Sequence, residues 1–585
     1  MPLHRILYFF NIYKWPFIIG TIFVILANIA SSYTNKLVED LINDLVRKLG
    51  KSTTTLDLIQ SDVILFLLYF LGLTLISALF TFLMRQTIII SSRKIEQHLK
   101  DDLYAHIQKI EIASFKKYNI GDFMSRMSED VGKIRELFGP AVMYLINMIT
   151  TLSVSIYFMQ QISLKLTCYA LIPLPFLSFF IYFFNQYSFR FNTKLQEELS
   201  SMTSLAQESY NGIRIIKSFT LENKVFTTFS QLSALYKTQA LKLVKLDSFF
   251  MPIVSLLMGT SILIAIYVGG ELVIRDEVKI GGLTSFIMFV NRLLWPVMSI
   301  GWVANLVQRG KASLVRYEEI MNLPIEEKGE KPLWRDLNGS IRVEHLNYTY
   351  PDTGILALDD ISFEIKKGER WLIVGKTGSG KTTLAEILMK FYPYEKGDIF
   401  INDINLREIS SDNVRSSISY IPQDVFLFSD TVQNNIAFGV ENASEERVRA
   451  IATDAQIHNE ILSFQHQYET MVGERGITLS GGQKQRISIA RALMKDSPIF
   501  LFDDCLSAVD VETERRLIEA MNQTDGEKTM ILITHRIFNQ LHFDHIIVLH
   551  DGKIIEKGTH EVLMAQKGYY FDLYQKQELS EKMVK

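Results

Sequence analysis

The chain has 585 residues, of which 48% are hydrophobic, and its mean hydropathy is +0.13. It is therefore too long for one domain and too apolar for an ordinary soluble protein. A formal net charge of −3 gives no basis for a nucleic-acid partner, and two cysteines exclude a disulfide framework.

Six apolar runs dominate the first half of the chain. Each is close to or above the roughly 20 residues that a helix needs to cross a bilayer. Five of them carry no charge, and the sixth is interrupted only by Arg292. The sequence predicts six membrane-spanning helices, at about 15–35, 63–84, 137–159, 166–189, 248–270 and 280–308.

Basic residues set the orientation of these helices. With the N-terminus inside, 20 Lys and Arg residues precede the first span or lie in the inner loops, and seven lie in the outer loops. This distribution fits the positive-inside rule. The two long inner segments, 85–136 and 190–247, are rich in helix formers, so we expect cytosolic extensions of the membrane helices. The N-terminus and the C-terminal half are then cytosolic.

A polar stretch with Pro324, Gly329 and Pro332 breaks the helical pattern after the sixth span. Short β-rich runs alternating with helices follow it, which is typical of an α/β domain. We expect an all-α transmembrane domain at 1–321, a linker at 322–339 and an α/β domain at 340–585.

A phosphate-binding loop lies between an apolar run at 371–374 and a helical pattern at 384–389. Its glycines let backbone N–H groups face phosphates, the lysine can reach the β- and γ-phosphates, and the threonine hydroxyl can bind Mg²⁺. This pattern predicts ATP as the ligand. The expected ATP-binding residues are Gly375, Lys376, Thr377, Gly378, Ser379, Gly380, Lys381, Thr382 and Thr383.

About a hundred residues later, a second glycine-containing motif opens another helical pattern. Its members are Leu479, Ser480, Gly481, Gly482 and Gln483. With six spans ahead of it, this pair of motifs resembles the half-transporters of the bacterial ABC exporters, over nearly the whole chain. The resemblance identifies the second motif as the ABC signature and implies a P-loop ATPase domain coupled to transport.

The resemblance also assigns roles to single residues. Tyr350 matches the aromatic that stacks on adenine, and Gln423 the Q-loop glutamine near Mg²⁺. Asp503 ends the Walker B run and is expected, with Thr382 and Gln423, to hold Mg²⁺. Three further matches are the switch histidine His535, the D-loop Asp510 and the exporter-specific loop Glu474. Taken singly, Tyr350 would more often be a packing aromatic and Gln423 a solvated loop residue, and it is the order of all the motifs together that favours their nucleotide roles.

The resemblance implies that two ATPase domains face each other, each ATP lying between one chain's Walker motifs and the other's signature. Most such sites place glutamate directly after the Walker B aspartate, but here Asp504 stands there. Its side chain is one methylene shorter, and a general base must lie within about 2.6–3.2 Å of the proton it takes. We expect the degenerate-site chain of a heterodimeric multidrug exporter, with catalytic candidates Asp504, His535 and Gln423. The alternative is a homodimer in which Asp504 is a slow base.

The substrate is left open by the sequence. The family resemblance favours export of hydrophobic or amphipathic compounds across the cell membrane, with lipid flipping as the alternative. A mainly regulatory nucleotide-binding subunit is a third interpretation. Arg292 is a candidate cavity residue, because an arginine within a span usually lines a cavity or meets a carboxylate, although snorkelling or packing fits equally.

Overall fold

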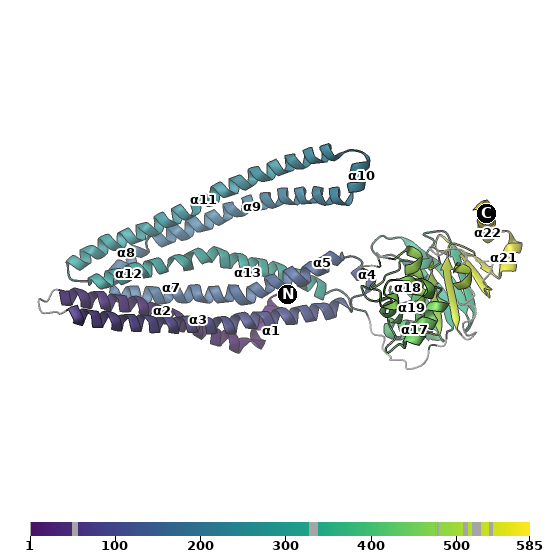
Figure 1. The fold of residues 1–585 in the computed structure, drawn as a ribbon, viewed down its shortest axis with the longest axis horizontal. Coiled ribbons are helices and arrows are strands. Elements are labelled where there is room, and N and C mark those ends of the chain that lie inside the picture. The colour runs from purple at the N-terminus through teal and green to yellow at the C-terminus, as the bar shows by residue number, and fades with distance from the viewer. Residues whose placement is uncertain are drawn as a thin grey trace. The chain divides into compact units, whose positions relative to one another are not determined.

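The computed structural model describes residues 2–49, 56–326, 337, 339–473, 476, 479–506, 513–517, 528–537 and 542–584. The chain forms two compact units. One comprises Met1–Gln108 with Asn119–Leu323, and the other Lys109–Tyr118 with Pro324–Lys585. The first unit is helical and the second is α/β (Figure 1).

The helical unit contains the apolar half of the sequence. Its helices are α1 (Pro2–Ile12), α2 (Lys14–Leu49), α3 (Leu56–Ile107), α5 (Ile120–Ser125), α6 (Val131–Glu136), α7 (Val142–Ile162), α8 (Leu164–Leu171), α9 (Pro173–Asn211), α10 (Ile213–Ser218), α11 (Glu222–Ile274), α12 (Ile280–Arg292) and α13 (Leu294–Met321), with π-helical turns η1 (Arg126–Asp130) and η2 (Leu137–Ala141). Six stretches of the described chain are long and apolar enough to cross a membrane, which confirms the predicted count.

The described spans extend well beyond the apolar runs. They are Lys14–Lys48, Val63–Ile107, Ile120–Ile162, Leu164–Asn211, Glu222–Ile274 and Ile280–Met321. The most apolar window of the second span has none of its residues buried in the protein, as expected for a helix that faces lipid. Helices α9 and α11 run side by side as a long hairpin, and α10 lies at its tip (Figure 1).

Prolines explain where the spans depart from regular helices. Pro140 lies in η2 and cannot donate to the carbonyl four residues before it, so the turn widens locally. Pro296 removes in the same way the donor for the carbonyl of Arg292, and the predicted single span at 280–308 is divided at Leu293 into α12 and α13. Pro173 lies in the first turn of α9, where no donor is needed.

The α/β unit contains two sheets. The four-stranded sheet is antiparallel and has the order β2 (Leu356–Ile365), β1 (Ile341–Thr349), β4 (Lys396–Ile401), β5 (Ile404–Asn405). The six-stranded sheet has the order β10 (Lys553–Gly558), β9 (His545–His550), β3 (Arg370–Gly375), β8 (Thr529–Thr534), β7 (Ile499–Asp503), β6 (Ile418–Ile421). Its strands are parallel except for β10 at one edge.

Helices of the same unit connect and cover these strands. They are α4 (Ile112–Phe115), α14 (Lys381–Leu388), α15 (Ser411–Ser417), α16 (Val432–Ala437), α17 (Glu445–Asp454), α18 (His458–Ser463), α19 (Gly481–Lys495), α21 (His560–Gln566) and α22 (Tyr569–Val584), with a 3₁₀ turn η3 (Gln467–Glu469).

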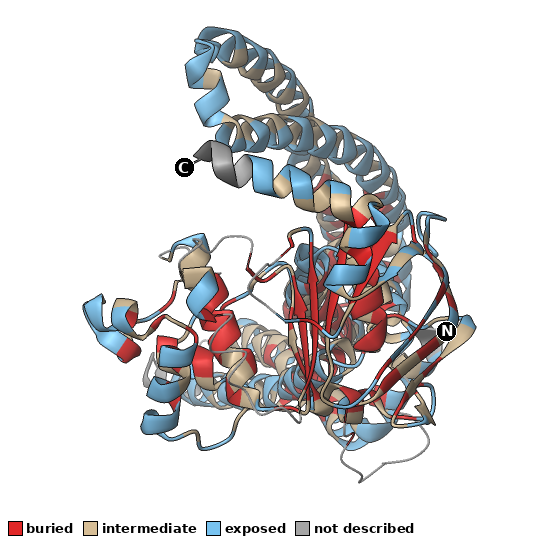
Figure 2. Cartoon of the chain, turned by 90° about the vertical axis from the view of Figure 1, so that its right-hand side faces the viewer, coloured by how far each residue is buried: buried red, intermediate tan, exposed pale blue. Residues whose placement is uncertain are grey.

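Alternate residues of the parallel strands enter two hydrophobic cores. In β3, Leu372 and Val374 belong to one core, and Trp371 and Ile373 to the other. All five residues of β7 are buried. Figure 2 shows strands at the centre of the α/β unit coloured as buried. Strands of a parallel sheet that is covered on both faces are apolar at nearly every position, and the sequence of these strands has that pattern. The sheet is therefore a rigid support for the loops at its edges.

In the helical unit, a buried carboxylate ties α13 to η1. Asp130 is 4% exposed and accepts hydrogen bonds from Ser313 Oγ at 2.8 Å and from Arg316 Nε at 2.9 Å. Arg316 also forms an ion pair with Asp130 through Nη2. The arginine side chain is 42% exposed and can be solvated by water. The buried carboxylate cannot, so loss of the arginine is expected to destabilise the protein more than loss of the carboxylate charge.

We predict that Arg316→Met destabilises the protein more than Asp130→Asn, by about 1–3 kcal/mol, because it leaves a buried carboxylate without its charged donor. Thermal unfolding of the purified transporter measures the difference. The double variant should recover most of the loss of Arg316→Met. Equal stability of the two single variants would contradict the assignment.

Candidate functional site

The carboxyl edge of the six-stranded sheet gathers the predicted nucleotide motifs. Strand β3 leads into the phosphate loop, β6 leads to Gln423, β7 ends at Asp503, and β8 leads to His535. Because these four strands are parallel neighbours, their carboxyl ends meet at the same edge, where α/β sheets bind ligands. The motifs are separated by up to about 160 residues in sequence and are adjacent in the fold.

These residues line one cavity of about 470 Å³. Its lining comprises Tyr350, Ile355, Leu356, Ala357, Thr377, Gly378, Gly380, Lys381, Thr382, Thr383, Gln423, Asp503, Asp504, His535, Asp551 and Gly552. Basic, acidic and aromatic groups therefore converge on a space suited to a nucleoside triphosphate.

Two glycines of the phosphate loop are required by close packing. A Cβ at Gly375 would lie 2.2 Å from the carbonyl oxygen of Leu549. Gly380 has a φ of +97°, and a Cβ there would lie 2.3 Å from the carbonyl oxygen of Ala357. Only glycine fits this backbone, which turns directly into α14.

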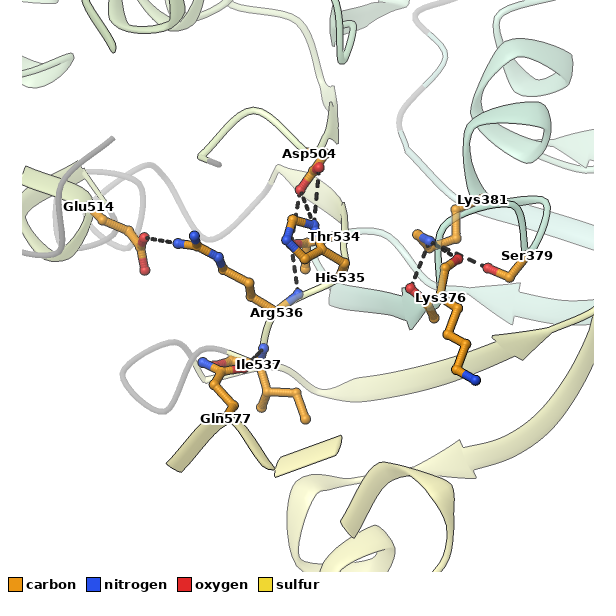
Figure 3. Close-up of polar contacts among 11 residues, drawn as sticks. Lys376, Ser379, Lys381, Asp504, Glu514, Thr534, His535, Arg536, Ile537 and Gln577 are labelled. Atoms are coloured by element: carbon orange, nitrogen blue, oxygen red, sulfur yellow. Dashed lines mark hydrogen bonds and ion pairs between the residues drawn. The ribbon is translucent and has the colours of Figure 1, made fainter. Parts of the chain in front are cut away.

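Lys381 is held inside the loop by backbone carbonyls (Figure 3). Its Nζ donates to the carbonyl oxygens of Gly375 at 2.8 Å and Lys376 at 2.7 Å, and contacts Ser379 Oγ at 3.4 Å. Burial lowers the pKa of Lys381, and the nearby carboxylates of Asp503 and Asp504 oppose that shift. The ammonium of Lys381 is thus held against the backbone of the loop.

The Tyr350 side chain is fixed on the rim of the cavity. Its hydroxyl lies 2.9 Å from Thr383 Oγ1, on the helix that follows the phosphate loop. Its ring makes edge contacts with Tyr348 and Tyr392, at centroid distances of 5.2 and 5.7 Å. The tyrosine therefore has an orientation that is set before any base arrives.

This aromatic group also connects to α4, which packs within the α/β unit. Lys116, which ends α4, donates to the Tyr392 hydroxyl and pairs with Glu386 of α14 at 3.3 Å. Ala113 of α4 packs against the same hydrophobic core as Tyr350. The first cytosolic loop is thus linked, through Tyr392, to the ring beside the cavity.

Asp503 ends β7 with its side chain buried. Burial raises its pKa to about 6, and a hydrogen bond from Thr382 acts in the opposite direction. Its Oδ2 is a buried atom with no hydrogen-bond partner in the described part of the chain. A buried carboxylate oxygen without a partner, beside a threonine hydroxyl, fits the hard oxygen ligands that Mg²⁺ prefers.

Asp504 follows with a left-handed backbone, at φ +47°. Its N–H donates to the carbonyl of Ile533 at 2.7 Å. Nδ1 of His535 lies 3.1 Å from both carboxylate oxygens, and Thr534 Oγ1 donates to Oδ1 at 3.3 Å (Figure 3). The carboxylate is therefore paired directly with the switch-histidine position.

The signature motif begins α19 but does not line this cavity. Ser480 caps the helix, because its Oγ accepts from Gln483 N at 3.3 Å and Gln483 Oε1 accepts from Ser480 N at 2.9 Å. Gln483 Nε2 also donates to Glu460 at 2.9 Å. Ser480 and Gly481 are exposed, so the positive end of a 15-residue helix faces outward.

Sequence analysis missed two features of the site. Asp551 and Gly552 form the turn between β9 and β10, and Gly552 N donates to the carbonyl of Ser379 at 3.2 Å. An Asp-Gly pair between two apolar runs is a strong hairpin signal that could have placed this turn. Arg491 of α19 donates to the carbonyls of Phe426 and Asn435, each at 2.9 Å, and so joins the signature helix to the segment after Gln423.

Three further positions were predicted from the sequence. Glu474 and Asp510 fall outside the residues that the structure describes. Arg292 lies in the helical unit, on a second cavity of about 540 Å³.

Comparisons with known proteins agree with this architecture. Residues 17–297 match the family model described as ABC transporter transmembrane region, and residues 358–507 match the one described as ABC transporter. The fold is similar to a bacterial Atm1-family ABC exporter with ATP bound, with a TM-score of 0.80, 24% identity, and 96% and 98% of the two chains covered.

Curated relatives match over most of their length. A probable multidrug resistance ABC transporter ATP-binding/permease protein, YheI of Bacillus subtilis, is 33% identical over 99% of this chain and 98% of its own. The multidrug resistance-like protein MdlA of Escherichia coli is 35% identical over 84% and 83%. An ATP-dependent lipid A-core flippase of Syntrophus aciditrophicus is 33% identical over 85% and 83%.

The chain belongs to the ABC transporters, as an exporter half-transporter that joins one membrane domain to one ATPase domain. It is a multi-pass protein of the cell membrane with a cytosolic ATPase domain that binds ATP and couples its hydrolysis to transport. The predictions of fold class, enzyme class and location are confirmed.

We predict that Lys381→Ala abolishes high-affinity ATP binding at this site, because the triphosphate then lacks its buried cation. Tyr350→Ala should weaken binding by about 1–3 kcal/mol through lost base stacking, whereas Tyr350→Phe should retain most of the affinity. Titration with a fluorescent ATP analogue measures both. Unchanged affinity in Lys381→Ala and Tyr350→Ala would overturn the site.

A second prediction concerns pH. The pKa of Asp503 is raised to about 6 in the folded protein from an ordinary 3.8. Ionisation of this buried carboxyl therefore destabilises the folded protein, and the loss of stability develops as pH rises from about 4 to above 6. Asp503→Asn should therefore raise the unfolding temperature of the nucleotide-free protein at pH 8, by the equivalent of about 1–3 kcal/mol, and leave it nearly unchanged at pH 4. Equal effects at both pH values would contradict the raised pKa.

Proposed function

We propose that this chain is the degenerate-site subunit of a heterodimeric exporter that moves hydrophobic or amphipathic compounds out of the cytosol or inner leaflet. Its Walker motifs bind ATP and turn it over slowly, while its signature completes the competent site of a different half-transporter. Alternating access of the paired membrane domains follows ATP-driven closure and release.

The observation that carries this proposal is the carboxylate at Asp504. An aspartate reaches about 1.5 Å less far than the glutamate usual at this position. The left-handed backbone and the hydrogen bond from its N–H to Ile533 fix where the side chain starts, and His535 contacts both of its oxygens. A displacement of 1 Å can lower a rate by about 10²-fold, so Asp504 is poorly placed as a base.

The signature supports the need for a second chain. Ser480 and Gly481 present an intact, capped helix N-terminus to solvent, and neither lines the cavity that contains this chain's own phosphate loop. A helix N-terminus attracts phosphate. This surface therefore suits the γ-phosphate of a nucleotide held by another ATPase domain.

Within this chain's own site, we assign a role in nucleotide binding to each predicted residue that the structure describes. Lys381 and the glycines bind the phosphates, and Tyr350 stacks on the base. Thr382, Gln423 and Asp503 would hold Mg²⁺, which would neutralise phosphate charge when bound. His535 would hold the γ-phosphate, in contact with Asp504.

The tip of the α9–α11 hairpin also supports a partner. No residue of α10 is buried, and large apolar side chains around it are exposed, including Tyr210, Ile215 and Phe219. Such a patch in a cytosolic extension marks a protein contact. We assign it to the ATPase domain of the second half-transporter.

A lipid-flipping homodimer is the second candidate function. It is favoured by the relative that carries the name of a lipid A-core flippase, which is 33% identical over 85% of this chain. The same membrane domain could then carry lipid, and Asp504 would be the working base in both sites.

The two proposals predict different effects of mutations in ATPase assays. For the heterodimer, Ser480→Trp should nearly eliminate turnover by obstructing the partner's γ-phosphate, while Asp504→Ala should lower it less than about threefold. In the homodimer, both changes should abolish hydrolysis. The proposal fails if Asp504→Ala is inactive, or if the chain purified alone transports at full rate.

Asp504→Glu is the matched control for the shortened side chain. It restores the missing methylene without changing charge. With the partner's Walker B glutamate replaced, so that only this chain's site is measured, hydrolysis should rise by at least about tenfold in Asp504→Glu, since a correctly placed general base contributes 10²–10⁴-fold.

A further inference from the structure

The cavity that contains Arg292 has the features of a built polar site. It is formed entirely by the helical unit and is lined by Asn28, Ser31, Asn35, Asn147, Thr151, Met288, Asn291, Arg292, Trp295 and Pro296. Three separate spans contribute to it: α2, α7 and the α12–α13 span. None of these lining residues is acidic.

A hydrogen-bond network holds the polar wall in place. Asn28, 7% exposed, donates from Nδ2 to Asn147 Oδ1 at 2.9 Å and to the carbonyl of Val24 at 3.1 Å. Thr151 Oγ1 donates to Asn28 Oδ1 at 2.9 Å. The amide orientation of Asn28 is therefore fixed by three contacts that do not involve the arginine.

Arg292 docks on this network through one nitrogen only. Its Nη2 donates to Asn28 Oδ1 at 3.0 Å and to the carbonyl of Asn28 at 3.3 Å. In the described part of the chain, Nε and Nη1 have no hydrogen-bond partner, and the guanidinium has no ion pair. One face of the cation is anchored, and the remaining donors are available to a ligand.

The network lies inside the apolar stretches of its helices, away from their outer ends. Arg292 is 12 residues from the outer end of α12, and Asn147 is 15 residues from the outer end of α7. At about 1.5 Å per residue these distances are about 18 and 22 Å, in a hydrocarbon core of about 30 Å. The guanidinium is directed to Asn28 of α2 within the helical unit, and this contact, rather than snorkelling to either surface, accounts for its position.

A cation in this position needs a compensating charge. Neutral amide and hydroxyl groups solvate a guanidinium, but they leave its charge uncompensated in a low-dielectric setting. An anionic ligand supplies the missing charge and can accept from Nε and Nη1 together, in the paired geometry that guanidinium favours with carboxylate and phosphate.

The other residues of the cavity favour a ligand that also has an apolar part. Trp295 is 57% exposed, and Met288 lies on the same wall, one turn before Arg292. The aromatic and thioether side chains can pack against a hydrophobic chain, and the fixed cation can bind a charged group at the end of that chain. The helix is interrupted at Leu293, directly after Arg292, and Pro296 in the first turn of α13 also lines the cavity.

We propose that this cavity is an anion-selective substrate subsite, in which Arg292 binds the carboxylate or phosphate head of an amphipathic compound. Asn28, held by Asn147 and Thr151, positions the guanidinium. The inference rests on the proposed export function for the identity of the ligand as substrate, and it extends that function by naming the charge of the substrate.

Equilibrium binding tests the subsite without ATP turnover. The probes are three fluorescent amphiphiles with one alkyl chain and a carboxylate, carboxamide or ammonium head, titrated onto the nucleotide-free transporter in zwitterionic nanodiscs. Wild type should bind the carboxylate most tightly. Arg292→Gln should weaken carboxylate binding by about 10–100-fold and change carboxamide binding less than about twofold, because a hydrogen-bonded charge is removed while the cavity wall is kept.

Two further variants separate charge from packing. Arg292→Lys should retain part of the carboxylate affinity, and Asn28→Asp should abolish the anion preference by supplying an internal counter-charge. Arg309→Gln is the matched control, because Arg309 is an exposed arginine of α13 that does not line the cavity. It should bind all three probes as wild type does.

Competition identifies the source of the head group. An anionic phospholipid in the nanodisc should displace the carboxylate probe if the ligand is a lipid, and a water-soluble aromatic carboxylate should displace it if the ligand is a dissolved organic acid. Either result supports anion binding. Equal affinity for all three probes, equal losses for all three in Arg292→Gln, or tighter ammonium than carboxylate binding in wild type would overturn it. Because this assay needs no hydrolysis, anion binding without vesicle export would refute the proposed export function alone.

Discussion

Parallel pairing of β3, β8, β7 and β6 is the constraint on which the ATPase depends. Each strand contributes one functional group just beyond its carboxyl end, and hydrogen-bonded neighbours are about 4.8 Å apart. Two apolar cores, one on each face, hold the strands rigidly. Without this sheet, the phosphate loop and Asp503 would be unrelated segments more than 100 residues apart.

The nucleotide site is electrostatically strained in a way that a ligand relieves. Lys381 is half-buried against backbone carbonyls, and Asp503 is buried with one oxygen that has no hydrogen-bond partner among the described residues. Burial lowers the pKa of the lysine and raises that of the aspartate, so both charged forms are disfavoured in the nucleotide-free protein. A triphosphate with a bound cation supplies what each group lacks. Binding energy is thereby concentrated where the phosphates lie.

The membrane domain shows the same principle in a less polar setting. Asn28, Asn147 and Thr151 satisfy one another within the hydrocarbon region, which makes them a stable platform. Arg292 is attached to that platform by a single nitrogen. The span is interrupted at Leu293 beside this platform, and Arg292 and Pro296, on the two sides of the break, both line the cavity. A polar group in a membrane domain that forms hydrogen bonds with the protein through only some of its donors can bind a ligand through the others.

Much of the molecule was predictable from the sequence because its signals are local. Apolar runs of about 20 residues fix the six spans, since a bilayer has one thickness. The glycine and lysine spacing of the phosphate loop fixes a strand–loop–helix unit, since few other backbones accept it. The order of the motifs gave the family, and the Asp504 departure was visible without coordinates.

Only the tertiary structure decided which distant groups meet. The sequence could not show that Arg292 binds Asn28, that the Asp551–Gly552 turn lies beside the phosphate loop, or that Lys116 contacts Tyr392. In each case the two partners lie on separate elements, and packing sets the distance between them. The sequence contains Pro296 but could not place the break at Leu293. A proline in a membrane helix either kinks the helix or leaves it straight, depending on whether neighbouring groups satisfy the freed carbonyl. Local sequence patterns determined the helices, strands and loops, and the packing of these elements determined which of their side chains are in contact.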